Sequence, residues 1–139
     1  MLFMVPQERC SMSNYFMLIS DRPIKKQNQM EEIEIPTSIQ KEINFIAKHA
    51  YKLEPVASDR LEIDAKKLAP EFYEKSLKWF KLLHNISKEL KKDSGNIVLI
   101  ATYYDQDLDD IIWEYEKFPI EKFNNEEFSF EFETIYTLE

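Results

Sequence analysis

Uninterrupted and alternating apolar runs predict the strands of a buried sheet. Residues 14–20 are mostly apolar and end at a turn that contains Pro23, a pattern typical of a buried strand. Residues 96–104 form a continuous apolar run, which predicts a central strand covered on both faces. Residues 32–35 alternate in polarity, and we expect them to pair with the first strand in a hairpin. A third, very short strand is predicted at residues 61–64.

Apolar residues at spacings of three and four predict three helices. The first covers residues 37–53, where Thr37 and Gln40 have the spacing of a capping box. The second and longest begins at Pro70 and ends before Gly95, because these residues favour a helix start and a helix stop. The apolar stripes of these two helices are Ile39, Ile43, Ile46, Ala47, Ala50 and Leu53, and then Phe72, Trp79, Phe80, Leu83, Ile86 and Leu90.

The last quarter of the chain predicts one more helix and one more strand. Residues 108–118 carry a third helical stripe that stops at Pro119. Residues 128–138 alternate aromatic or aliphatic with polar side chains, which predicts a long strand with one buried and one wet, negative face. The order is roughly ββαβαβαβ. We therefore expect one α+β (or α/β) domain over residues 14–139, a mixed and mostly antiparallel sheet with about three helices packed on it, after a loosely ordered lead at residues 1–13.

Composition excludes several classes of protein. The chain has 139 residues, of which 44% are hydrophobic and 14% aromatic, so it is long and apolar enough to fold as one domain and is not a disordered chain. A single glycine excludes the glycine-rich loops that bind phosphate groups. The net charge of −8 argues against direct binding to nucleic acid or to a membrane surface, since both are anionic.

Cysteine and histidine are too scarce for metal chemistry based on them. Cys10 is the sole cysteine, which excludes an intramolecular disulfide and a thiolate cluster. His49 and His84 are the only histidines and lie on different predicted helices, so we expect them to be boundary residues with local hydrogen bonds. The apolar start at residues 1–5 is interrupted by Pro6, which does not fit a signal peptide. These features favour a cytoplasmic protein without a membrane span.

The negative charge is concentrated at the end of the chain. Residues 1–104 contain 16 basic and 14 acidic side chains, a balance of +2, and residues 105–139 contain 2 basic and 12 acidic ones, a balance of −10. Some of these carboxylates have a local structural explanation, because Asp107 is placed to cap the third helix and Asp109 and Asp110 lie in its first turn. The others form a negative field, which favours a basic partner.

The third predicted helix places Trp113 outside the apolar stripe and among carboxylates. We expect this side chain to face outward or to be half-covered, with packing against the loop at Pro119 as the alternative. An aromatic side chain surrounded by acids is typical of a binding surface for a basic protein. The predicted partner-binding residues are Tyr104, Asp105, Asp107, Asp109, Asp110, Trp113, Glu114 and Glu116, with Glu131 and Glu133 as additional candidates.

The same carboxylates also suggest metal binding. Asp105, Asp107 and Asp109 have the spacing of the first ligands in an EF-hand calcium loop. The sixth place, where that loop needs a glycine for its sharp turn, is Asp110, and the preceding residues predict a strand and not a helix. The sequence therefore predicts no metal site and no cofactor. A weaker site for a divalent cation built from these carboxylates is kept as an alternative.

The sequence as a whole favours a non-enzymatic acidic binding protein. We expect an inhibitor of a basic partner such as a nuclease toxin, in the manner of an immunity protein or antitoxin, or a mimic of nucleic acid whose carboxylates stand in for phosphates. No catalytic residue is predicted. Two alternatives are a calcium- or magnesium-dependent protein or enzyme that uses Asp105 to Glu116, and a structural subunit that forms homo-oligomers through the strand at residues 128–138.

Overall fold

The computed structural model describes residues 14–25, 30–53, 60–61, 63–103, 107–125 and 128–139. These residues form a six-stranded sheet with the strand order β2-β3-β1-β5-β8-β6 and a two-stranded ribbon, β4-β7. All neighbouring strands are antiparallel except β6 and β8, which are parallel. The prediction of one α+β domain with a mixed, mostly antiparallel sheet is therefore confirmed, although the order of the elements differs from the expected one.

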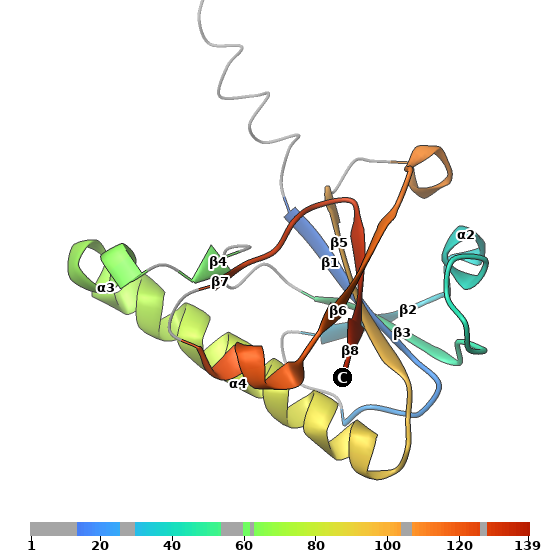
Figure 1. Ribbon diagram of the computed structural model, residues 1–139, viewed down its shortest axis with the longest axis horizontal. Helices are drawn as coiled ribbons and strands as arrows, with labels where there is room; N and C mark the ends of the chain where they lie inside the picture. The colour runs from blue at the N-terminus through green and yellow to red at the C-terminus, as the bar shows by residue number, and fades with distance from the viewer. Residues whose placement is uncertain (1–13, 26–29, 54–59, 62, 104–106, 126–127) are drawn as a thin grey trace, which may run out of the picture.

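The elements have the following bounds (Figure 1). The six-stranded sheet contains β1 (Asn14–Ser20), β2 (Met30–Ile33), β3 (His49–Leu53), β5 (Ile97–Tyr103), β6 (Glu114–Phe118) and β8 (Thr134–Leu138). The ribbon contains β4 (Arg60–Leu61) and β7 (Phe128–Ser129). The α-helices are α2 (Thr37–Gln40), α3 (Ile63–Leu68) and α4 (Pro70–Lys92), and two 3-10 helices are η1 (Leu108–Asp110) and η2 (Ile120–Asn124).

The sheet has a hydrophobic cluster on each face. α4 and η2 lie on one side of the sheet, and α2 and η1 lie on the opposite side (Figure 1). β5 contributes to both clusters, because Leu99 packs on the α4 side and Val98 and Ile100 pack on the α2 side. The predicted double-sided burial of this strand is confirmed, and it explains why the run has no polar residue at alternate positions.

The long helix α4 begins at Pro70 as predicted. One face of it carries exposed lysines, namely Lys75, Lys78, Lys81, Lys88 and Lys92. One detail differs: the buried stripe starts at Tyr73, and Phe72 is 46% exposed. The helix is amphipathic, so its stability depends mainly on the face that it buries. The buried residues of α4 are Tyr73, Ser76, Trp79, Phe80, Leu83, His84, Ile86, Ser87 and Leu90.

The C-terminus of α4 ends in a Schellman motif. The Gly95 N–H donates to the Leu90 carbonyl (3.0 Å) and the Ser94 N–H donates to the Lys91 carbonyl (3.1 Å). The left-handed residue is Ser94, with φ of 59°, and not the glycine that the sequence suggested. Gly95 is required for a different reason, since a β-carbon there would lie 2.7 Å from Leu90 Cδ2 and 3.0 Å from Arg22 Cγ.

The predicted helix over residues 37–53 is wrong. Only α2 is helical, and Thr37 makes no capping hydrogen bond. Gln40 instead closes the following loop, because its Nε2 donates to the Phe45 carbonyl and its Oε1 accepts from the Ala47 N–H, both at 2.8 Å. The last residues of the range form β3, which fills the gap between β1 and β2. Strand pairing on both edges of β3 stabilises the extended chain, and this outweighs the preference for a helix that the spacing of the apolar residues indicates.

The predicted helix over residues 108–118 is also wrong, since this range forms η1 and then β6. Ile111 and Ile112 are β-branched and Trp113 and Tyr115 are aromatic, and such residues favour an extended chain. The spacing is ambiguous, because apolar residues stand at steps of two as well as at steps of three and four. The extended conformation reverses the expected orientation of three side chains, those of Ile112, Trp113 and Tyr115.

The remaining strand predictions are confirmed in part. The long strand over residues 128–138 is divided into β7 and β8 by a turn in which Glu133 has φ of 58°. The second strand lies at Met30–Ile33, and it pairs with β3 and not with β1. The third short strand ends at Leu61, after which α3 begins. The predicted lead at residues 1–13 lies outside the described residues.

Phe130, between β7 and β8, is the centre of an aromatic cluster under α4. Its side chain is 4% exposed. Aromatic rings bury large areas and prefer tilted or edge-to-face packing, which is the geometry found at most of these contacts. Its ring centroid lies 5.1–6.3 Å from the ring centroids of Phe16, Phe80, Phe118, Phe123 and Tyr136.

Asp21 joins the end of β1 to the residue before β5. Its two carboxylate oxygens accept hydrogen bonds from the Asn96 N–H and from Asn96 Nδ2, both at 2.8 Å. Burial alone raises the pKa of Asp21, but the hydrogen bonds from Asn96 outweigh it, so the pKa lies below its ordinary value of 3.8. The ionised carboxylate is therefore the form that stabilises the fold.

The end of α4 yields a first prediction. We expect Ser94→Gly to raise the free energy of unfolding by about 1 kcal/mol, because glycine adopts a positive φ without strain. Gly95→Ala should lower it by about 1–3 kcal/mol, since the new methyl group overlaps Leu90 in the core. Urea unfolding followed by circular dichroism measures both. A destabilising Ser94→Gly, or a neutral Gly95→Ala, would contradict the assigned roles.

Asp21 yields a prediction on pH. Because the folded pKa lies below the unfolded one, the contribution of this carboxylate is present above about pH 4 and is lost as the pH falls through the folded pKa. We expect Asp21→Asn to be less stable than the wild type at pH 7, by under about 1 kcal/mol for this exposed group. The difference should shrink in acid. A constant difference from pH 7 to pH 2 would argue against this role.

Candidate functional site

The acidic residues that follow β5 are positioned by a capped turn. Asp107 is the N-cap of η1, where its Oδ1 accepts from the Asp109 N–H (3.0 Å) and its carbonyl accepts from the Asp110 N–H (3.1 Å). This turn exposes the side chains of Asp109 and Asp110. The capping role expected for Asp107 is confirmed, although the element that it caps is a 3-10 turn and not a longer helix.

Two buried side chains anchor the segment that connects η1 to β6. Ile111 and Trp113 are both 8% exposed and pack into the cluster on the α2 side of the sheet. Ile112, between them, points the other way and is 91% exposed. The expectation that Trp113 faces outward among carboxylates is therefore wrong, because the chain is extended here and its side chains alternate. Trp113 holds the acidic segment in place and is not part of its surface.

β6 is an edge strand of the six-stranded sheet, and only its β8 side is paired. The Glu114 N–H donates to the Glu133 carbonyl and the Phe118 carbonyl accepts from the Glu139 N–H, both at 3.0 Å. Backbone groups of successive residues in a strand point to opposite edges. Tyr115 and Lys117 therefore direct their N–H and C=O groups away from β8, toward an edge with which no strand of the described residues pairs.

The side chains of β6 divide between the two faces of the sheet. Phe118 belongs to the cluster on the α4 side, so Glu114 and Glu116 share that face, and Tyr115 and Lys117 lie on the α2 side. All four are exposed, Tyr115 by 57%. The surface therefore presents carboxylates on one face and an aromatic ring with a lysine on the other.

A contact with Glu42, in the turn after α2, orients Tyr115. Its hydroxyl donates a hydrogen bond to Glu42 Oε1, and this bond, together with the carboxylate charge, raises the pKa of Tyr115 above its ordinary value. Lys117 Nζ lies 4.0 Å from Glu139 Oε1, a contact between exposed side chains that contributes little stability. Glu42 is 73 residues away from Tyr115 in the sequence. Its place beside the site depends on the tertiary fold.

We define the acidic edge as the exposed residues Asp109, Asp110, Ile112, Glu114, Tyr115 and Glu116. It contains four of the eight residues predicted from the sequence, while Trp113 is buried and Asp107 serves as a cap. Tyr104 and Asp105 lie outside the described residues. Glu131 is exposed in the turn before β8, and Glu133 is half-buried there with its carbonyl bound by Glu114. Ile112 and Tyr115 were missed because a helix would have buried them.

The four carboxylates of the acidic edge have no cationic partner in the part of the chain that the structure describes. Among the described residues, no ion pair involves the side chain of Asp109, Asp110, Glu114 or Glu116. Neither do the described residues contain a group of three acidic, histidine or cysteine side chains placed to hold a metal ion. Exposed carboxylates on η1 and β6 without such partners create a negative potential that attracts a cationic group.

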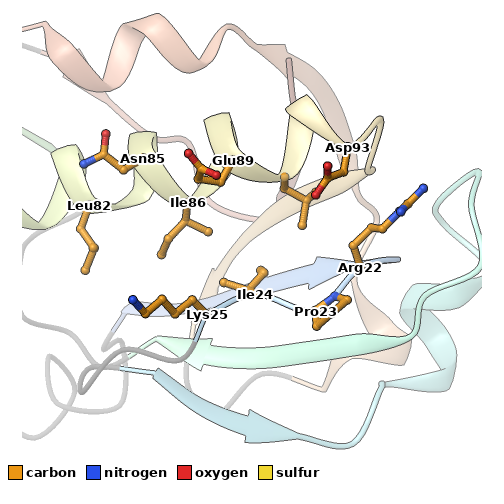
Figure 2. A pocket seen from close by; sticks show the side chains of 10 residues that line it. Arg22, Pro23, Ile24, Lys25, Leu82, Asn85, Ile86, Glu89 and Asp93 are labelled. Atoms are coloured by element: carbon orange, nitrogen blue, oxygen red, sulfur yellow. The ribbon is translucent and has the colours of Figure 1, made fainter.

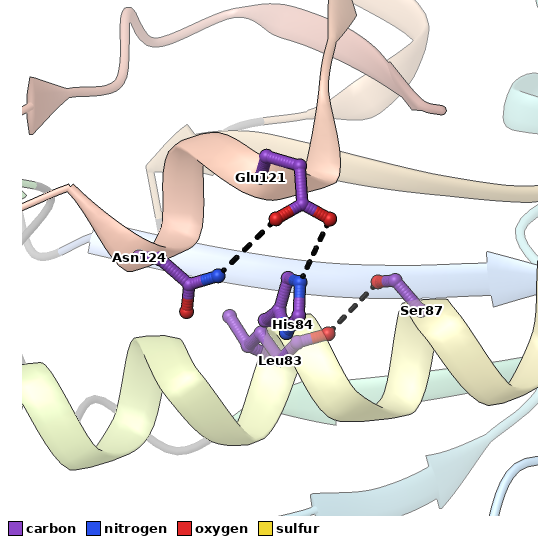
Figure 3. A network of polar contacts seen from close by, with 5 residues as sticks. All are labelled: Leu83, His84, Ser87, Glu121 and Asn124. Carbon is purple, nitrogen blue, oxygen red and sulfur yellow. Dashed lines mark hydrogen bonds and ion pairs between the residues drawn. The ribbon is translucent and has the colours of Figure 1, made fainter.

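His84 has a structural role at a different place. It is buried on α4, and its Nε2 lies 3.3 Å from Glu121 Oε1 on η2, while Asn124 Nδ2 donates to Glu121 Oε2 at 3.4 Å (Figure 3). Ser87 Oγ donates to the Leu83 carbonyl within the helix. This network joins η2 to α4. The expected hydrogen bond of His84 is therefore present, but its partner is distant in the sequence.

An open pocket of about 480 Å³ lies between the second half of α4 and the segment Arg22–Lys25 (Figure 2). Apolar side chains from both sides line it, among them Ile24 and Ile86. The charges on its walls are of both signs and equal in number, so the lining carries no net charge. The charged residues that line it are Arg22, Lys25, Glu89 and Asp93.

Comparisons with known proteins do not place this chain in a family. No protein-family model, no curated protein and no solved structure matches it significantly. No helix in the described part of the chain is both long and apolar enough to cross a bilayer. The geometry of the acidic edge is therefore the feature of this chain that points to a function.

The adjacent residues Ile112 and Trp113 provide a direct test of this geometry. We expect Trp113→Ala to lower the free energy of unfolding by about 3–5 kcal/mol, because it removes a large buried ring. Ile112→Ala should change it by less than about 0.5 kcal/mol, since that side chain contacts mainly solvent. Chemical denaturation of both variants measures the contrast. If Trp113→Ala were neutral, the tryptophan would belong to the exposed surface after all.

Proposed function

We propose that this protein is a non-enzymatic binding protein and that the acidic edge is its contact surface for a basic protein. The observation that carries this proposal is that η1, the segment after it and β6 expose four carboxylates that pair with no cation of the described residues, together with the exposed side chains of Ile112 and Tyr115. Carboxylates provide long-range attraction and selectivity, and the apolar atoms provide area that is removed from water.

The partner is expected to bind nucleic acid or to cut it. A protein that contacts phosphates has a basic surface, and the exposed carboxylates of η1 and β6 are complementary in charge to such a surface. An inhibitor of a nuclease toxin, acting as an immunity protein or antitoxin, has this property. A protein that mimics nucleic acid has it as well, and both act by covering the basic site of the partner.

The position of β8 argues against the alternative of a structural subunit that forms oligomers through its last strand. A structural subunit that pairs through its last strand needs a free edge on that strand. β8 lies between β5 and β6 and pairs with both, so neither of its edges is free. The open edge of this end of the sheet belongs to β6, which carries the acidic residues.

The proposal predicts salt-sensitive capture of a basic partner. We expect the immobilised protein to retain one basic protein from a lysate of the source cells at low salt and to release it at high salt, because exposed charges are screened. Neutralising the acidic edge should weaken binding of the purified partner by roughly a hundredfold at low salt. The variant for this purpose is Asp109→Asn, Asp110→Asn, Glu114→Gln and Glu116→Gln.

A matched control separates the acidic edge from total charge. The control variant neutralises four exposed acids elsewhere: Glu31→Gln, Glu32→Gln, Glu71→Gln and Glu74→Gln. It has the same net charge as the edge variant and should bind the partner with an affinity close to that of the wild type. If both variants lose the partner equally, the binding surface is not the acidic edge. Asp107 is left unchanged because it caps η1.

A further inference from the structure

Besides its charged side chains, β6 has backbone hydrogen-bonding groups that point away from the sheet. Tyr115 and Lys117 direct their N–H and C=O groups away from β8, and among the described residues no strand occupies that side. An unpaired strand edge accepts an additional strand through main-chain hydrogen bonds. Trp113 and Phe118, at its two ends, are buried, and this keeps the edge extended and in register before a partner arrives.

We propose that the partner adds a β-strand to the open edge of β6 and that this strand carries basic residues at alternate positions. This inference rests on the proposed function and specifies how the partner is recognised. Main-chain bonds to Tyr115 and Lys117 supply part of the affinity, and the side chains on the two faces supply the selectivity.

The alternation of β6 determines the pattern of the added strand. Directly opposed side chains on one face of a sheet interact. On the α4 face the partner meets Glu114 and Glu116, so it needs lysine or arginine at every second residue. On the other face it meets the exposed ring of Tyr115 and the cation of Lys117, so the intervening residues are apolar and not basic.

The charges of β6 oppose pairing with a second copy of this chain. If β6 paired with itself in an antiparallel register centred on Tyr115 or Glu116, a glutamate of one copy would lie across from a glutamate of the other, and like charges in opposed positions destabilise a sheet. The charges on this strand therefore disfavour self-association and favour a basic strand. The net charge of −8 acts in the same direction.

Two peptides of equal composition test the inference. In the first, lysine and valine alternate, and in the second the lysines precede the valines as a block. We expect the alternating peptide to bind at least about tenfold more tightly, because it alone places lysines opposite both glutamates and a valine opposite Tyr115 while its backbone pairs with β6. Isothermal titration at low salt measures both affinities.

Substitutions at one position separate backbone pairing from charge. Lys117→Pro removes the outward N–H, and it spares the ladder to β8 because Lys117 does not direct its amide to that strand. Lys117→Ala removes the same side chain and keeps the N–H. We expect Lys117→Ala to bind the alternating peptide as the wild type does, and Lys117→Pro to bind it about tenfold more weakly. Thermal melts of both variants confirm that they are folded.

Hydrogen exchange on the wild-type protein provides a measurement that needs no variant. The amide protons of Tyr115 and Lys117 should exchange more slowly when the alternating peptide is bound, and the block peptide should protect them less. Equal affinity of Lys117→Pro and Lys117→Ala, with no protection of these two amides, would overturn strand addition.

The failure of this inference can be told apart from the failure of the proposed function. If Glu114→Gln with Glu116→Gln weakens binding while the Lys117 variants and amide exchange are unaffected, the acidic edge binds through charge alone and strand addition is wrong. If neutralising these glutamates leaves the affinity for both peptides unchanged, the acidic edge is not the binding surface, and both proposals fail.

Discussion

The burial of β5 on both faces is the constraint on which the rest of the structure depends. A strand with no polar face needs a cover on each side and a neighbour at each edge. α4 supplies one cover, and the short elements α2 and η1 supply the other together with Trp113. β1 and β8 supply the neighbours. Because β8 is needed beside β5, the outermost position in the sheet is left to β6.

The acidic edge follows from this arrangement. Ile111 and Trp113 are drawn into the cluster on the α2 side, and an extended chain anchored at alternate residues must expose those in between. The same alternation continues through β6, which carries the charged side chains of Glu114 and Glu116. On the side away from β8, its backbone N–H and C=O groups pair with no strand of the described residues. Edge strands with charged residues are a common protection against aggregation. In β6 the charges of Glu114 and Glu116 repel an acidic strand, and they attract a basic one.

The two proposals depend on different interactions, namely attraction between charges and hydrogen bonding by the main chain. Capture of a basic partner depends on unpaired carboxylates, which act over long distances and weaken with salt. Strand addition depends on the backbone of Tyr115 and Lys117, which acts only at hydrogen-bonding distance and is insensitive to salt. A partner that uses both would associate rapidly through charge and be held in register by the main chain. The pocket beside α4 has no such excess of negative charge, since the charged residues of its lining balance.

The sequence by itself determined the α+β class, the two-sided burial of residues 97–103, the long helix from Pro70 and the concentration of acids after residue 104. These depend on local pattern and composition. It did not determine the conformation of residues 41–53 or 111–118, where apolar residues fit a helix and a strand about equally and the need for strand neighbours decided. Tertiary structure alone therefore buried Trp113, exposed Ile112 and brought Glu42 to Tyr115, because the orientation of a side chain depends on which element contains it.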